Sequence, residues 1–150
     1  MSVAVQAAPF DIAAEIAALT AGRTDIGAIV TFTGTVRGNA KSGPIVSMEL
    51  EHYPGMTERE LARVEALAVA RWPLQGARIV HRIGVLKPGD DIVLVIAASA
   101  HRQAAFEAAA FLMDYLKTSA PFWKKETGVD GVGTWVDARE VDDAAMKRWE

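Results

Sequence analysis

The stretch that decides the fold is RIVHRIGVLKPGDDIVLVIAA, residues 78–98, in which two apolar runs flank a dense turn. Residues 78–86 and 92–98 are rich in β-branched side chains, which favour strands. The sequence Pro88-Gly89-Asp90-Asp91 between them is typical of a turn. We therefore predict two strands joined as a hairpin.

A long helix is predicted directly after this hairpin, from about Ala100 to Thr118. Apolar residues recur there at helical spacing, and Pro121 ends the pattern because proline cannot continue a helix. The predicted buried face consists of Phe106, Ala109, Ala110, Met113 and Leu116.

Two further strands are predicted upstream of the hairpin. Residues 27–36 are rich in β-branched and aromatic side chains. Residues 45–52 alternate, with Val46, Met48 and Leu50 on the face that we expect to be buried. The intervening residues 38–44 are dense in turn formers and predict an exposed loop.

Capping signals mark two more helices. Asp11 is predicted to cap a short helix that ends near Leu19. Thr57 and Glu60 form a predicted capping box, and Pro73 stops the helix that follows it. The predicted core stripe of that helix is Leu61, Val64, Leu67 and Ala68.

The end of the chain completes the predicted set of elements. Residues 134–137 predict a last strand, and residues 142–149 predict a terminal helix. Strands mixed with segregated helices indicate an α+β fold, which we expect to form one domain over residues 1–150.

Composition excludes several classes of protein and site. The formal net charge is −3, which argues against a general nucleic-acid binder. The chain has no cysteine, so thiolate metal ligands and cysteine nucleophiles are excluded. The apolar run at residues 92–98 is far shorter than the roughly 20 residues that cross a bilayer. No secretion signal precedes the domain, so we expect a cytoplasmic protein.

Basic side chains gather where the predicted elements end. They are Arg37, His101, Arg102, Lys117, Lys124 and Lys125. Cations in the first turn of a helix oppose its dipole, so His101 and Arg102 suggest an anionic ligand there. The alternatives are that Arg102 pairs with an acidic neighbour and that the dipole alone favours Lys117. If these side chains meet, they predict a phosphate- or carboxylate-binding pocket.

Ordered segments along most of the chain carry a family resemblance. They are VTFTG at 30–34 with Val36-Arg37, LEHYPGM at 50–56, HRIG at 81–84, SAHR at 99–102, FEA at 106–108, MDYLKT at 113–118, APFWKKE at 120–126, and WV at 135–136 with ARE at 138–140. Together they resemble the molybdopterin synthase large-subunit family.

The resemblance implies an α/β hammerhead-type fold with mixed and antiparallel strands. It also implies a homodimer in which each copy holds a small ubiquitin-like sulfur-carrier subunit, giving a heterotetramer. The family converts cyclic pyranopterin monophosphate to molybdopterin, with sulfur from a thiocarboxylate on the small subunit's C-terminal glycine. We expect that glycine's tail to enter a groove beside Phe122 and Trp123. No cofactor, metal, nucleic acid or membrane is expected, and the absence of cysteine fits sulfur delivery by a partner.

The resemblance also assigns site residues. It implies that Lys117 and Lys124 are catalytic. The implied substrate-binding set is Thr35, Val36, Arg37, His101, Arg102, Lys117, Lys124, Lys125, Glu126 and Arg139.

Three matters stay open from the sequence. A non-catalytic scaffold for a ubiquitin-like protein is the main alternative function. A phosphate-ester enzyme ranks below it, because no nucleophile or metal constellation is apparent. It is also open whether residues of a second subunit complete each pocket.

Overall fold

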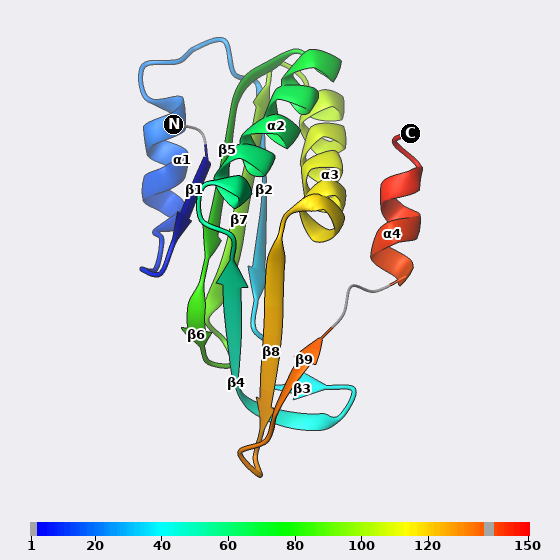
Figure 1. Cartoon of the computed structure of the whole chain (residues 1–150). Helices are drawn as coiled ribbons and strands as arrows, with labels where there is room; N and C mark the ends of the chain where they lie inside the picture. The colour runs from blue at the N-terminus through cyan, green and yellow to red at the C-terminus, as the bar shows by residue number, and fades with distance from the viewer. Residues whose placement is uncertain (1–2, 137–139) are drawn as a thin grey trace.

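The computed structural model describes residues 3–136 and 140–150, which form two sheets and the helices around them (Figure 1). The first sheet has the strand order β1 (Val3–Gln6), β5 (Leu74–Arg82), β7 (Asp91–Ser99), β2 (Ala28–Thr35). β1 runs parallel to β5, and the other two pairs are antiparallel. This mixed sheet carries the main hydrophobic core.

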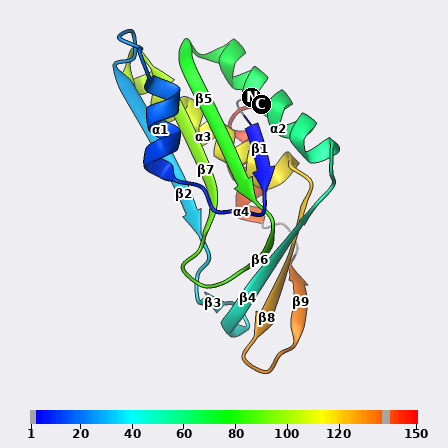
Figure 2. The same ribbon diagram turned by 90° about the vertical axis from the view of Figure 1, so that its left-hand side faces the viewer.

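The second sheet extends away from the helical end of the molecule (Figure 2). Its order is β3 (Asn39–Ala40), β4 (Gly43–His52), β8 (Phe122–Gly128), β9 (Gly133–Val136), and β6 (Gly84–Leu86) also pairs with β4. β4 and β8 are its long antiparallel centre.

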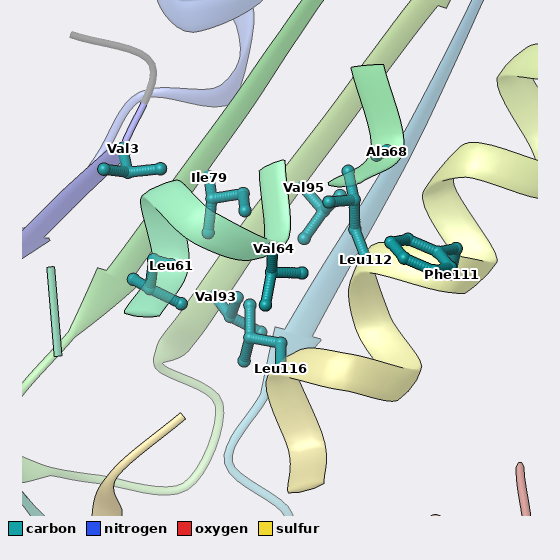
Figure 3. Packing of buried hydrophobic residues seen from close by; sticks show 10 residues of the cluster. All are labelled: Val3, Leu61, Val64, Ala68, Ile79, Val93, Val95, Phe111, Leu112 and Leu116. Carbon is teal, nitrogen blue, oxygen red and sulfur yellow. The ribbon is translucent and has the colours of Figure 1, made fainter. Parts of the chain in front are cut away.

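Helices cover both faces of the first sheet (Figures 1 and 2). On one face, α1 (Ile12–Thr20) packs against Val80, Leu94 and Ile96. On the other lie α2 (Met56–Arg71) and α3 (Arg102–Ser119), whose buried side chains pack with those of β1, β5 and β7 in the cluster of Figure 3. α4 (Glu140–Lys147) packs against α3. In the described chain, no helix is long and apolar enough to cross a membrane.

The predicted antiparallel pairing within residues 78–98 is confirmed, but residues 78–86 do not form one continuous strand. β5 does pair with β7, but the chain leaves the first sheet at Ile83 and continues as β6 in the second. Gly84 has a φ of 90°, a conformation that glycine adopts without a Cβ clash. Residues 78–98 therefore connect the two sheets, and this connection brings the sheets together around the site.

The predicted buried face of α3 is also partly wrong. Phe106 is 62% exposed, whereas Phe111 is 1% exposed and lies beside Trp72 and Tyr115. The side chains that face the core are Ala105, Ala108, Ala109, Phe111, Leu112 and Leu116. Small alanines near the start of the helix let it approach the sheet closely, while larger side chains fill the space further along.

A bulge and a different cap explain two local corrections. In β4 the register shifts between Ile45 and Ser47, so Ile45 is buried and Val46 is 49% exposed. The N-cap of α2 is Gly55, whose N–H donates to the Glu58 carboxylate at 3.4 Å, so the predicted capping box of Thr57 and Glu60 is wrong. The Thr57 hydroxyl is buried, where it accepts from the Tyr53 N–H and donates to the Pro121 carbonyl. Leu67, predicted in the core stripe of α2, is 37% exposed.

Other predictions are confirmed, and two strands were not predicted. Asp11 caps α1 by accepting the Ala14 N–H at 3.0 Å, and α2 ends before Pro73. The predicted loop at 38–44 contains the short β3–β4 pairing. The unpredicted strands are β1 and β8, and β8 is the one that carries Lys124.

Candidate functional site

A pocket of about 300 Å³ lies where the two sheets and the C-terminal end of α3 meet. Its lining comes from most of the strands as well as from α3. The lining residues are Phe32, Gly34, Thr35, Arg37, Asn39, Met48, Leu50, His81, Ile92, Val93, Leu116, Lys117, Ala120, Phe122, Lys124, Glu126 and Val136. The pocket therefore depends on the complete fold, and no local sequence motif encloses it.

Strand alternation in β8 directs two of the predicted residues into the pocket. Lys124 lies opposite Leu50, and Glu126 lies opposite Met48; both of these β4 residues also line the pocket. Lys125 lies between them in sequence and therefore faces the other side of the sheet. There its ammonium sits 5.8 Å from the ring centroid of Trp135. The structure thus separates Lys125 from Lys124.

Arg37 and Lys117 reach the same pocket from two different parts of the chain. Arg37 follows β2, whose end is held by the Val36 N–H donating to the Asp90 carbonyl at 2.9 Å. Lys117 lies in the last turn of α3, next to the buried Leu116. Val36 itself is 3% exposed and packs in the core of the second sheet, so its side chain does not line the pocket.

The charge of the pocket is positive. Among its described lining residues, the cations Arg37, Lys117 and Lys124 outnumber the single carboxylate of Glu126. Apolar walls surround these charges, which strengthens their attraction for an anion relative to open water. This local concentration of cations in an acidic chain suits a ligand that carries phosphate or carboxylate groups.

His81 forms a neutral part of the pocket wall. Its ring stacks on Phe122 with centroids 3.8 Å apart, and Nδ1 lies 2.8 Å from the Arg82 carbonyl. Burial, together with the positive charge of Lys117, lowers the pKa of His81 to about 4. The ring also borders the pocket.

His101 and Arg102 do not join this pocket within one chain. They lie at the start of α3, and Lys117 lies 15 residues beyond Arg102. At 1.5 Å per helical residue this separation is roughly 22 Å. His101 and Arg102 line a separate shallow depression with Gly27, Ala100 and Gln103. The length of the helix was visible in the sequence and could have signalled this separation.

The predicted set of site residues and the observed pocket lining differ at several positions. Arg139 falls in residues 137–139, outside the described residues. The pocket also contains residues that the sequence did not assign to the site, among them Met48, Leu50, His81 and Phe122. Met48 and Leu50 could have been found from the alternation of β4, because its inward face also faces Lys124 and Glu126.

Comparison with known proteins gives consistent matches. Residues 5–119 match the family model described as MoaE protein. A "Molybdopterin synthase catalytic subunit" from Mesorhizobium japonicum is 60% identical over 150 residues, covering 99% of this chain and 93% of that protein.

Two solved structures share the fold. The "Molybdopterin biosynthesis MoaE protein" from Burkholderia ambifaria is 51% identical with a TM-score of 0.84, covering 99% of this chain and 97% of that one. One chain of a "Protein-protein complex of subunit 1 and 2 of Molybdopterin-converting factor" from Helicobacter pylori is 18% identical with a TM-score of 0.74, covering 93% and 92%. The second likeness concerns the fold alone. The predicted α+β hammerhead-type fold is confirmed.

Proposed function

The chain belongs to the MoaE protein family, and we propose that within this family it is the catalytic subunit of a molybdopterin synthase. It would convert cyclic pyranopterin monophosphate to molybdopterin with sulfur from a thiocarboxylated small subunit. The observation that carries this proposal is the pocket that joins Arg37, Lys117 and Lys124 from three separate parts of the chain.

The pocket offers suitable groups for each part of this reaction. Arg37 can bind the substrate's phosphate through paired N–H donors. Attack by the thiocarboxylate sulfur on a substrate carbon forms a C–S bond and transfers negative charge to the oxygen that departs from that carbon, and the ammonium of Lys117 would stabilise that oxygen. Water would then hydrolyse the thioester, so that the carrier leaves as a carboxylate and the sulfur stays on the substrate, with Lys124 donating or accepting the proton in this step. Thr35 and Glu126 border the same space and would complete the substrate contacts.

The family resemblance implies that the sulfur donor would be a small ubiquitin-like subunit, and the absence of cysteine from this chain fits sulfur delivery by a partner. Its C-terminal glycine must reach Lys117, so its tail would enter the pocket. Phe122 lines the pocket, whereas Trp123 is 49% exposed on the other side of β8. We therefore expect the tail to lie on the Phe122 side only.

A second copy of the chain would complete each site. His101 and Arg102 are too far from Lys117 to contact the same ligand in one chain. In a homodimer, the start of α3 from one copy would approach the pocket of the other. Two such copies with two small subunits form the expected heterotetramer. Arg139 remains a predicted substrate-binding residue. The cytoplasm remains the expected compartment of the protein, and cell fractionation would test this.

The test mixes the chain with a thiocarboxylated small subunit and cyclic pyranopterin monophosphate and measures molybdopterin formation. We expect product from the wild type and none above background from Lys117→Ala. Lys147→Ala is the matched control, because this exposed lysine lies in the last turn of α4 as Lys117 lies in the last turn of α3. A wild-type chain that binds the small subunit but forms no product would support the scaffold alternative instead.

A further inference from the structure

The pocket contains one buried titratable side chain, among those described, to which the proposed sulfur transfer assigns no role. His81 is 6% exposed and lies on β5, facing Phe122 of β8. Burial of a histidine ring in the wall of a cavity is unusual without a polar partner for each nitrogen. The hydrogen bonds of its two ring nitrogens therefore decide what it can do.

The tautomer of His81 follows from its one hydrogen bond. Nδ1 lies 2.8 Å from the Arg82 carbonyl oxygen, and a carbonyl only accepts hydrogen bonds. Nδ1 therefore carries the proton, and in the neutral ring Nε2 is an acceptor with a lone pair. No residue of the described chain donates a hydrogen bond to Nε2.

The surroundings keep this ring uncharged. On the neighbouring strands, Val5 and Val93 lie opposite His81 and bring no charge. The facing ionisable groups are Lys117 on α3 and His52 on β4, and a positive charge on either disfavours protonation of His81. His52 in turn lies 4.0 Å from Glu58 of α2. Arg82 directs its guanidinium to the Ala7 and Asp91 carbonyls.

The Nε2 atom of His81 differs from the cationic groups of the pocket because it can accept a hydrogen bond. Arg37, Lys117 and Lys124 can only donate hydrogen bonds while they are charged, and they suit the anionic part of a substrate. The pterin part of the proposed substrate also presents N–H donors, and a charged lysine or arginine cannot accept a hydrogen bond from them. The lone pair of Nε2 offers such a donor a neutral partner, and the stacked rings of His81 and Phe122 form a flat wall beside it.

We infer that His81 is a substrate-binding residue whose Nε2 accepts a hydrogen bond from an N–H group on the heterocyclic part of the substrate. Arg37 and the two lysines then hold the phosphate end, and His81 fixes the orientation of the ring system. This inference rests on the proposed function, because it names a contact to the same substrate.

The test compares two substitutions at the same position. His81→Phe keeps a ring to stack on Phe122 but removes the acceptor, so KM for cyclic pyranopterin monophosphate should rise about tenfold. His81→Gln supplies a carbonyl acceptor and should recover part of that loss. Small-subunit affinity should stay unchanged in both variants. An unchanged KM in a folded His81→Phe variant would overturn the inference.

A measurement on the wild-type chain avoids any folding defect of the variants. The ¹⁵N chemical shift of His81 Nε2 should move on addition of cyclic pyranopterin monophosphate, in the direction that accepting a hydrogen bond produces. Sulfate, which fills an anion site but carries no donor, should leave that shift nearly unchanged. Equal shifts with both ligands would refute the contact. A wild type that binds the pterin and shows the shift, yet makes no product, would refute the proposed function alone.

Discussion

Lys124 and Lys125 are adjacent in sequence, but β8 directs their side chains to opposite faces of the second sheet. We expect Lys124→Ala to lower the rate of molybdopterin formation about 100-fold, because it removes a proton-transfer group from the pocket. Lys125→Ala should change the rate by less than about threefold, because its cation–π contact with Trp135 is a surface interaction. Rates with saturating small subunit measure both. An equal loss in Lys125→Ala would restore the sequence-based assignment of Lys125 to the substrate site.

His81 also gives the fold a defined pH dependence. Its pKa is about 4 in the folded chain against 6.5 for an unperturbed histidine, so the unfolded state binds more protons between these values. The stabilisation is therefore complete above pH 6.5 and is lost as the pH falls toward 4. Between pH 7 and 4.5 the loss attributable to His81 should be about 2–3 kcal/mol. Urea unfolding of the wild type and His81→Phe at both pH values measures it; an identical pH dependence in the two proteins would contradict this origin.

At the level of elements, α3 contributes side chains both to the hydrophobic core and to the pocket. Phe111 is 1% exposed and has ring neighbours in Trp72, Tyr115 and Trp149. Phe111→Ala should therefore lower the free energy of unfolding by about 3–5 kcal/mol. Phe106→Ala on the same helix is the control, since this ring is 62% exposed and should cost less than about 1 kcal/mol. Chemical denaturation measures both. A large loss in Phe106→Ala would mean that another copy covers this ring in solution.

The elements also show what the sequence could predict. Caps and proline stops placed α1 and the end of α2, because they act through nearest neighbours along the chain. The buried face of α3 and the outward turn of Val46 in β4 were wrong, because they depend on close packing and on a bulge. β8 was missed, since its charged residues alternate between a pocket and a surface and give no apolar pattern.

For the whole molecule, the composition of the pocket likewise depends on the packing of distant segments, which the sequence alone did not fully predict. The family resemblance named Arg37, Lys117 and Lys124, and the fold brings these three together. It gave no role to His81, which enters the pocket only because the chain crosses between the sheets after β5. It grouped His101 and Arg102 with the lysines, although the length of α3 keeps them apart in one chain.

The separation of these two groups along α3 leads to a prediction about the assembled homodimer. If a second copy supplies His101 and Arg102, Lys117→Ala and Arg102→Ala should each abolish sulfur transfer when assayed alone. Mixed dimers of the two variants contain one pocket with both defects and one with neither.

Co-refolding equal amounts of the two variants should therefore restore about a quarter of the wild-type activity, because half of the dimers are mixed and half of their pockets are intact. Two variants with the defect on the same side, Lys117→Ala and Lys124→Ala, provide the control, and their mixture should stay inactive. If the Lys117→Ala and Arg102→Ala mixture also stays inactive although native mass spectrometry detects mixed dimers, the two groups do not share a pocket. Arg102 would then act at the separate depression at the start of α3, and each chain's pocket would bind the substrate without it.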